Sequence, residues 1–280
     1  MGLRVNTNIA SLNSQRHLRL TRQNLDRSLE RLSSGSKINR AGDDAAGLAI
    51  SENLRAQIRG LGQAERNAMD GVSLVQVAEG GLQEISNILI RLRELAVQAA
   101  SDTVGPTERK FLNTEYDALM SEIDRIANAT EFNRIPLLNG TGSVFDIQVG
   151  TRNNPNVDRI TFFDSSSADV SAVALGINLS SVADKASAQN TLSAIDNAIV
   201  SVSSIRADFG AMQNRLQAII NNLAISIENM SAANSRIRDT DVASETSELT
   251  KNNILMQAGT AVLAQANASI TSALSLLKTG

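Results

Sequence analysis

The sequence predicts a mainly α fold: a long antiparallel helical rod or coiled-coil bundle built from both chain ends, with a small β-hairpin region in the middle. Apolar residues repeat every seven positions over much of the chain, which is typical of a coiled-coil seam. Only 2% of the 280 residues are aromatic, so a bulky central core is not expected. The three prolines, at 106, 136 and 155, leave the chain beyond them free for uninterrupted helices.

The N-terminal half begins with a weakly specified helix and continues with a strongly periodic one. Apolar residues follow helical spacing up to Leu12 and again from Leu18, with a slip of phase between the two. A shorter amphipathic helix is expected between residues 107 and 128, where Pro106 suits the first helical position. The long periodic helix is predicted by a seven-residue series at Leu54, Leu61, Ala68, Val75, Leu82, Leu89 and Ala96.

The middle of the chain, from Asn139 to about Ala186, loses the helical period. "SVFDIQVG" at 143–150 and "VDRITFFD" at 157–164 alternate in the manner of strands, and "TRNNPN" between them is a cluster of turn residues. These features predict one β-hairpin. The serine-rich "SSSADVSA" that follows is predicted to be an exposed loop.

The C-terminal half carries two further apolar series with small or polar partners. Asn252, Gly259, Ala266 and Ala273 occupy the second seam positions of the last series. Such residues weaken a lone pair of helices and suit a crowded assembly in which several helices approach closely. The two series run through Ile195, Val202, Phe209, Leu216, Leu223, Met230 and Ile237, and through Leu249, Met256, Leu263, Ile270 and Leu277.

Glycines and adjacent acids interrupt the helical pattern between residues 32 and 51. Gly35 is suited to stopping the first helix, and Gly42 to a bend after it. Asp43 and Asp44 could form a metal or acid/base site, or they could cap the helix that follows. Neighbouring residues on a helix point about 100° apart and make a poor chelate, and no other ligand cluster accompanies them. We therefore interpret the four residues as a joint between two helices.

Composition and motifs argue against catalysis and against several classes of partner. The net charge is −3, with 26 basic and 29 acidic residues, so no nucleic-acid partner is expected. No apolar run reaches membrane-spanning length, so no membrane insertion is expected, and the N-terminus lacks a cleavable secretory signal. Cysteine is absent and His17 is the single histidine, which limits metal sites and catalytic triads. We expect no cofactor, no metal and no enzymatic activity.

Long motifs at both ends of the chain resemble those of the bacterial flagellins. At the N-terminal end they are "VNTNIASLNSQRHL" (5–18), "ERLSSGSKINRAGDDAAGLAIS" (30–51) and "ERNAMDGVSLVQVAEGGLQEISNILIRLRELAVQAAS" (65–101). At the C-terminal end they are "RADFGAMQNRL" (206–216), "NSRIRDTDVASETSELTKNNILMQAGTAVLAQAN" (234–267) and "SLLK" (275–278). The resemblance covers nearly the whole chain. It implies a structural subunit that polymerises into the flagellar filament for swimming motility.

The resemblance also implies a division of the chain, here in a minimal form without large exposed middle domains. Residues 1–42 would form an N-terminal inner-tube helix and 239–280 a C-terminal one. Residues 43–138 and 187–238 would form the outer-tube rod, and 139–186 the short hairpin and variable middle. The apolar stripes of the termini would be buried between subunits, and the residues expected there are Leu25, Leu29, Leu32, Leu263, Ile270, Leu274 and Leu277.

Partners and location follow from the same resemblance. The subunit would leave the cell through the flagellar type III export channel with an export chaperone. It would then meet the flagellar cap and junction proteins and add to a homopolymer of itself outside the cell. Some flagellins also engage a vertebrate flagellin-sensing Toll-like receptor. The matching positions here are Arg91, Leu95 and Glu115, although Ile90 stands where receptor-active members commonly have Gln.

Two further expectations complete the reading. Flagellins are often O-glycosylated in exposed middle segments, where the candidates here are Thr161, Ser165, Ser166, Ser167 and Ser171. The nearest alternative function is that of the hook–filament junction protein, whose termini resemble flagellin. The full "GDDAAGLAIS" and "QAGTAVLAQAN" matches favour flagellin.

Overall fold

A computed structural model describes residues 7–141, 144–164 and 168–278, except for the side chains of 162–164 and 270–278. Five helices dominate it: α1 (Ile9–Ser34), α2 (Ala45–Ala99), α3 (Pro106–Ala129), α4 (Lys185–Arg238) and α5 (Val242–Lys278). The mainly α prediction is confirmed. The chain divides into two compact units, one of residues 1–56 and 229–280 and the other of 57–228.

The helix ends follow capping chemistry that the sequence supplies. Asn8 accepts a hydrogen bond from the Ser11 amide at the start of α1, and Gly35 ends that helix with a left-handed φ of 69°. Pro106 occupies the first turn of α3, where its missing N–H costs nothing. Asp184 accepts hydrogen bonds from the Ala186 and Ser187 amides and so begins α4.

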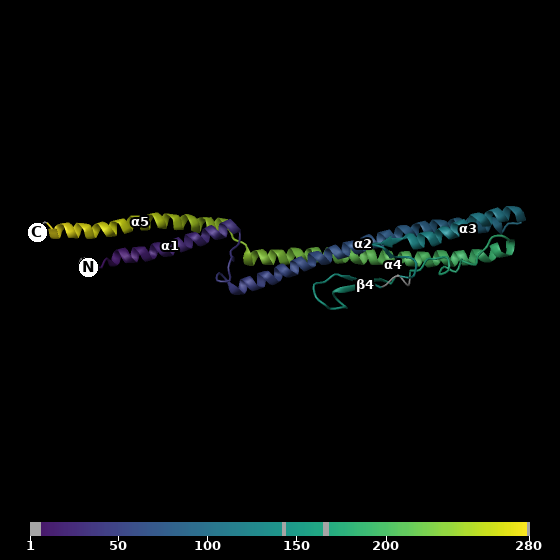
Figure 1. Cartoon of the computed structure of the whole chain (residues 1–280), viewed down its shortest axis with the longest axis horizontal. Coiled ribbons are helices and arrows are strands. Elements are labelled where there is room, and N and C mark those ends of the chain that lie inside the picture. The colour runs from purple at the N-terminus through teal and green to yellow at the C-terminus, as the bar shows by residue number, and fades with distance from the viewer. Residues whose placement is uncertain (1–6, 142–143, 165–167, 279–280) are drawn as a thin grey trace. The chain divides into compact units, whose positions relative to one another are not determined.

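Within residues 57–228, α2, α3 and α4 lie side by side around one hydrophobic core (Figure 1). Ion pairs show that α3 and α4 each run antiparallel to α2: Arg91 bonds Glu115, Arg93 bonds Asp196, and Arg206 faces Glu79. The seven-residue series predicted from the sequence supplies much of the core. Its fully buried members include Ala68, Val75, Leu82, Leu89, Ala96, Ile195, Val202 and Leu216.

The predicted hairpin is present as β3 (Val144–Gln148) and β4 (Arg159–Asp164), which pair antiparallel with a register shift between Phe145 and Asp146. A second hairpin, β1 (Glu131–Phe132) and β2 (Ile135–Pro136), was not predicted. Its two-residue turn holds Asn133 and Arg134 at positive φ of 51° and 64°, the conformation of a type I′ turn. Each of these strands has only two residues, which is too short for the alternation of apolar and polar residues that predicts a strand.

Glycines of α2, which lack side chains, leave room for the middle segment to pack closely against this helix. The Thr151 side chain lies on Gly60, that of Ile147 on Gly71, and those of Thr130 and Leu138 on Gly81. These glycines are ten or eleven residues apart, about three helical turns, so they lie on one face of α2. The Asn67 side-chain amide also donates to the Gln148 carbonyl at 3.0 Å. Small residues on α2 therefore fix the hairpin to the helix.

The expectation of an exposed serine-rich loop was wrong for its described part. Ala168, Val170 and Ala172 are buried in the core, and Ile177 follows them there. The Ala172 amide is also held by the Asp124 carboxylate of α3. The serines suggested a solvated loop, but the apolar residues between them provide enough anchors to hold the segment against the helices. Ser165, Ser166 and Ser167 lie outside the described residues.

Candidate functional site: the terminal helix pair and its joint

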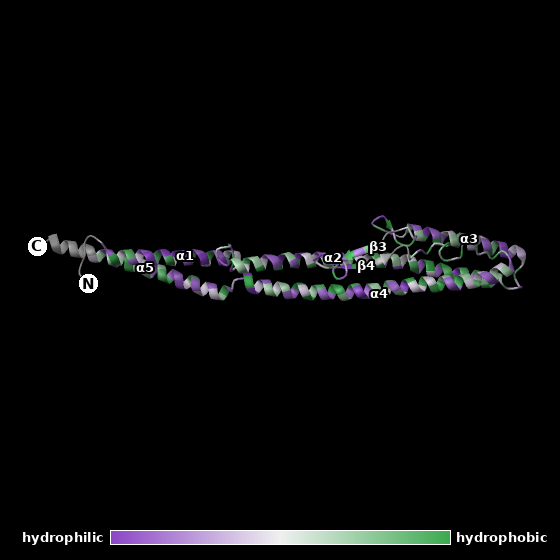
Figure 2. Ribbon diagram, turned by 90° about the horizontal axis from the view of Figure 1, so that it is seen from below, coloured by the Kyte–Doolittle hydropathy of each residue, from purple (hydrophilic) through white to green (hydrophobic). Residues whose placement is uncertain are grey.

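The helices from the two chain ends, α1 and α5, form an antiparallel pair. At one end the Asn8 side chain donates to the Ala266 carbonyl at 3.0 Å. Midway, the Leu18 side chain lies on Gly259, and at the other end Arg31 faces Glu245 at 3.5 Å. Figures 1 and 2 both show the two helices side by side. Segments about 260 residues apart in sequence thus form one structural element.

The seam between these two helices is unusually polar. On α1 it alternates leucines with hydroxyl residues, and Ser11 and Ser28 are buried. On α5 it includes buried Asn252, and Figure 2 shows polar and apolar residues interleaved along both helices. The sequence suggested a slip in the apolar period between Leu12 and Leu18. In the structure the heptad is continuous, because Ser11 occupies the position equivalent to Leu18, seven residues earlier. The least exposed positions are Ser11, Ser14, Leu18, Thr21, Leu25, Ser28, Leu32, Glu245, Leu249, Asn252, Met256, Gly259, Leu263 and Ala266.

Apolar side chains of the pair point instead to its outside. Ile9 is 64% exposed and Ile254 is 61% exposed, although both are large aliphatic residues. In the described parts of residues 1–56 and 229–280, Ile38 is the one fully buried hydrophobic side chain. Exposed apolar residues that recur along one element are typical of an interaction surface. We call this set the outer apolar face: Ile9, Leu12, Leu20, Leu29, Ile254, Leu255 and Val262.

The residues predicted to mediate assembly occupy three different environments. Leu25, Leu32 and Leu263 are half-buried in the seam of the pair. Leu29 is 49% exposed and belongs to the outer apolar face. Ile270, Leu274 and Leu277 lie on α5 beyond the described side chains. Sequence reasoning missed Leu20, Leu255 and Val262, which lie off the seven-residue series; the signal was a second apolar stripe beside it.

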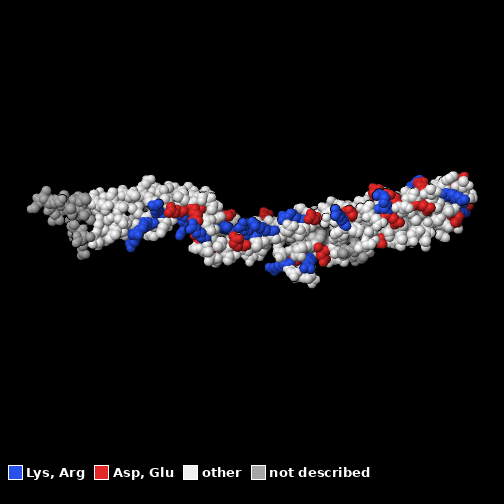
Figure 3. Space-filling model, in the orientation of Figure 1, with Lys and Arg blue, Asp and Glu red and all other residues white. Residues whose placement is uncertain are grey.

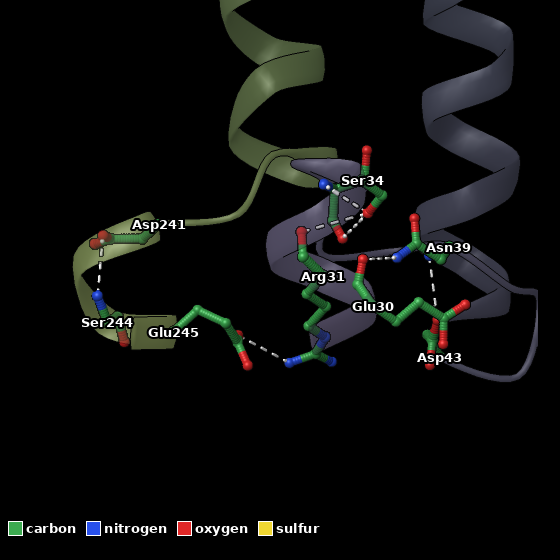
Figure 4. A network of polar contacts seen from close by, with 9 residues as sticks. Glu30, Arg31, Ser34, Asn39, Asp43, Asp241, Ser244 and Glu245 are labelled. Atoms are coloured by element: carbon green, nitrogen blue, oxygen red, sulfur yellow. Dashed lines mark hydrogen bonds and ion pairs between the residues drawn. The ribbon is translucent and has the colours of Figure 1, made fainter. Parts of the chain in front are cut away.

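The joint holds both linkers of this unit together. The Lys37 amide donates to the Arg238 carbonyl at 2.6 Å, and the Thr240 amide donates to the Gly35 carbonyl at 3.0 Å. Ser36 and Asp239 thereby form an isolated antiparallel β-bridge. The link from α1 to α2 and the link from α4 to α5 are thus bonded to each other through their backbones. Figure 4 shows polar side chains around these links, among them the Arg31–Glu245 ion pair.

The two aspartates of the joint have different tasks. Asp44 accepts a hydrogen bond from the Gly47 amide at 2.9 Å and caps α2. The Asp43 carboxylate instead accepts from the Asn39 and Arg40 amides and closes the linker on itself. Those two bonds, Arg40 first, hold the pKa of Asp43 below its usual value. Gly42 has open space around its Cα and an ordinary φ, so it supplies flexibility without a steric demand.

Ion pairs brace the same joint on both sides. Arg238 at the end of α4 bonds Glu52 near the start of α2 at 2.6 Å, and this bond lowers the pKa of Glu52. Arg31 at the end of α1 faces Glu245 in the first turn of α5, while its buried Nε has no partner among the described atoms. Asp241 caps α5 by accepting from the Ala243 and Ser244 amides. The joint is therefore held together by backbone hydrogen bonds, helix caps and ion pairs.

Nothing in this site resembles a catalytic or metal-binding arrangement. In the described parts of the chain, no three His, Cys, Asp or Glu side chains gather where they could hold a metal ion. His17 is exposed on α1. Within the same residues, none of the helices is both long and apolar enough to cross a bilayer. What the arrangement offers is surface for association.

The residues matched to receptor contacts lie on α2 and α3. Arg91 donates to Glu115 through Nε at 3.0 Å and Nη2 at 2.8 Å, and to Glu94 at 2.9 Å. These bonds, with Glu115 first, raise the pKa of Arg91. Arg91 and Glu115 are about half-exposed, whereas Leu95 is buried. Of the glycosylation candidates, Thr161 is exposed and Ser171 is half-buried in a turn with Asp169.

Comparisons with known proteins agree at the level of sequence family and of fold. The profile of the bacterial flagellin N-terminal helical region matches residues 5–143, and that of the C-terminal helical region matches 192–277. A flagellin of Halalkalibacterium halodurans is 45% identical over 98% of this chain and 99% of its own length. A flagellin of Bacillus subtilis is 44% identical over 99% and 100%. A 33 kDa flagellar filament core protein of Treponema phagedenis is 41% identical over 98% and 99%.

Solved structures support the same assignment. The crystal structure of Bacillus cereus flagellin matches with a TM-score of 0.51 and 35% identity, covering 60% of this chain and 94% of that one. A putative flagellar hook-associated protein from Vibrio parahaemolyticus matches with a TM-score of 0.57 but 16% identity, so it shares the fold alone. The junction-protein alternative is therefore not favoured. Two family profiles and relatives matched over nearly their whole length place the chain in the bacterial flagellin family, the structural subunits of the flagellar filament.

Proposed function

We propose that the α1·α5 pair is the polymerisation element of this filament subunit, and that its outer apolar face packs against the same element of neighbouring copies. The observation that carries the proposal is the inverted distribution of side chains in the pair. Its seam buries serines and Asn252, while Ile9, Ile254 and Val262 face outward. A segment that cannot bury its apolar surface within one chain is completed by association.

We also propose which parts of the chain form the inner and outer layers of the filament. Residues 1–42 and 239–280 would form the inner tube of the filament, and 43–138 with 187–238 the outer rod around the middle segment 139–186. The joint at Gly35, Gly42, Asp43 and Asp44 would connect the two, with the backbone bridge between Ser36 and Asp239 holding both linkers in one place. Leu25, Leu32 and Leu263 would then set the seam. Leu29 would face other copies, and so would Ile270, Leu274 and Leu277, which lie on α5 past Ala266, where the Asn8 side chain bonds.

A charge placed on the outer apolar face tests this assignment. Val262→Asp puts a carboxylate where the side chain is 57% exposed in one chain, so the monomer should keep its helix content. In the filament that charge would be buried, at a cost of several kcal/mol, and polymerisation should be lost. Gln257→Asp, at another exposed position of the same helix, is the matched control and should polymerise normally. Filaments of the Val262 variant, seen by electron microscopy with unchanged heat stability, would refute the proposal.

The remaining partners follow the family. We propose export through the flagellar type III channel with a chaperone, growth beneath the cap, and contact with junction proteins, with no cofactor and no enzymatic activity. Flagellins are a structural protein family, which supports the last point. Intact-mass measurement of filaments tests for O-glycosylation at Thr161, at Ser171 and in the 165–167 segment, since each hexose adds a defined mass.

Receptor recognition is a second proposed role, and it rests on Arg91 and Glu115. Both side chains are about half-exposed and hold one another in a fixed pose, which leaves a shaped polar patch on α2 and α3. Leu95 is buried, so it would not itself touch a partner. Arg91→Ala should remove activation of cells that carry the flagellin-sensing Toll-like receptor, while Arg125→Ala on α3 should leave it intact. Equal activation by both variants would exclude the patch.

A further inference from the structure

A shallow pocket at the distal end of α2 and the start of α3 presents an unpaired carboxylate beside an exposed aromatic ring. Gln98, Val104, Glu108 and Phe111 are among its lining residues. Phe111 is 72% exposed, although it is one of only six phenylalanines in the chain. Glu108 is exposed and forms no ion pair within the described residues. Gly105 leaves room for its carboxylate, since a Cβ there would collide with the Glu108 oxygen.

This combination of groups suits an arginine side chain. A guanidinium can stack on the face of a phenylalanine ring and donate two hydrogen bonds to a carboxylate beside it. The compact ammonium group of lysine cannot make this bidentate contact, and an apolar ligand would leave the Glu108 carboxylate without a hydrogen-bond donor. Glu108 is the one charged side chain among the residues that line the pocket, so the pocket itself carries a negative charge. The pocket therefore calls for a cation with a flat, bidentate head.

Arg152, in the loop between β3 and β4, matches this requirement. Its side chain is exposed, and none of the described residues forms an ion pair or side-chain hydrogen bond with it. The backbone beneath it is fixed, because the Gln148 side chain donates to the carbonyls of Gly150 at 2.9 Å and of Arg152 at 2.8 Å. Figure 3 shows basic side chains on this protruding loop. The loop thus displays a free guanidinium on a rigid base.

Arg152 cannot reach the pocket of its own chain. Thr151, the residue before Arg152, lies on Gly60 of α2, whereas the pocket begins at Gln98 of the same helix. Those 38 residues of continuous helix separate the two by about 57 Å. A contact between them must therefore join two copies. Two different surfaces that meet in this way form a head-to-tail interface, which generates an open helical filament when its rotation does not close a ring.

We propose that Glu108 and Phe111 of one copy receive Arg152 of the next copy along a row of subunits, and that this contact sets an axial offset of about 57 Å. The proposal rests on the filament function, and it adds a contact outside the terminal helices. It joins residues 57–228 of successive copies, so it would stabilise a row of subunits independently of the α1·α5 pair.

The absence of cysteine from the chain allows a direct test. Filaments copolymerised from a Glu108→Cys variant and an Arg152→Cys variant are treated with a short bis-maleimide. We expect covalent dimers from the mixture, a ladder of higher oligomers from the double variant, and no cross-link from either single variant alone. Glu108→Cys mixed with Arg134→Cys is the control, since Arg134 is also exposed and free of ion pairs among the described residues. Filaments that form without the cross-link, or with equal cross-linking in the control, would overturn the contact while leaving the filament function standing.

Charge exchange gives a second readout on the full chain. Glu108→Arg and Arg152→Glu should each raise the critical concentration for polymerisation by roughly tenfold, the combined loss of one exposed ion pair and one cation–π contact. The double exchange should recover most of that loss, whereas Arg134→Glu should change nothing. Circular dichroism verifies that each variant keeps its helices. Single exchanges that polymerise like the parent protein would contradict the proposal.

Discussion

The α1·α5 pair and the α2–α3–α4 core differ in the burial of their apolar residues. In the core, Leu82, Leu89 and Ile195 are fully buried, and the heptad pattern continues from one helix to the next. In the terminal pair, the buried heptad positions hold Ser11, Ser28 and Asn252, while Ile9, Leu20 and Ile254 are exposed on the outside. One region is complete within a single chain and the other is not. A polymerising subunit needs both, because it must stay folded as a monomer and still gain free energy on assembly.

Removal of the terminal helices is expected to have the largest effect. Trimming about 40 residues from either end deletes one partner of the α1·α5 pair but leaves the α2–α3–α4 core and its buried residues. The trimmed chain should be a soluble, mostly helical monomer that does not polymerise. Sedimentation and electron microscopy, with the full chain as control, measure this. Filament growth by the trimmed chain would remove the functional difference between the two regions.

Truncation of a core side chain should affect stability and not assembly. Leu89 is fully buried, so Leu89→Ala should lower the free energy of unfolding by about 3–5 kcal/mol, through lost burial and the cavity left behind. Leu20→Ala, at a 52% exposed position of α1, should cost less than about 0.5 kcal/mol and should weaken polymerisation instead. Urea titration of both variants shows whether the regions differ as described; similar losses in the two would argue that they do not.

Alkaline pH should act on the core through Tyr116. Burial raises the pKa of Tyr116 to about 12, and the Ser180 hydroxyl beside it opposes the shift. A raised pKa in the folded state stabilises the fold below the unfolded value near pH 10, and this contribution is lost as the pH rises towards 12. The loss should reach roughly 2–3 kcal/mol. Tyr116→Phe removes it and also the hydroxyl, which has no well-formed hydrogen bond in the described structure. Parallel pH curves for the parent and this variant would contradict the assignment.

Strengthening the terminal seam should have the smallest effect. Asn252→Leu replaces a buried polar residue with an apolar one and should stabilise the α1·α5 pair by about 1 kcal/mol. Amide hydrogen exchange in α5 should slow by about fivefold, with no change in α2. Asn253→Leu, one residue along on an exposed position, serves as the control. Unchanged exchange in the Asn252 variant would show that the polar seam does not limit the pair.

The sequence predicted the regular parts of both regions and missed the irregular ones for identifiable reasons. Heptad spacing located the seams of α2 and α4, where buried apolar residues follow the helix period, and the seam of α5, where the apolar series is half-buried. The seam of α1 was obscured by Ser11, a small polar residue at a buried position. The β1–β2 hairpin was missed because two residues per strand carry no alternation. Val170 and Ile177 show that a serine-rich segment can still be anchored by a few apolar side chains.

The candidate site was predictable in position more than in detail. Gly35 correctly predicted the end of α1, and the two aspartates after Gly42 correctly predicted the start of α2. Which acid caps and which closes the linker depends on the backbone path, as do the bonds of Lys37 and Thr240 to the other linker. The outer apolar face required knowing which side of α5 meets α1. That information comes from contacts between segments far apart in sequence, which no local pattern contains.

Hydrogen exchange of the full chain, compared between monomer and filament, tests the central claim most directly. If the terminal pair is completed only by neighbouring copies, amides of α1 and α5 should exchange within seconds in the monomer and become protected in the filament, while α2, α3 and α4 are protected in both. Equal protection of α1·α5 and the core in the monomer would contradict this account, as would unprotected terminal helices in the filament.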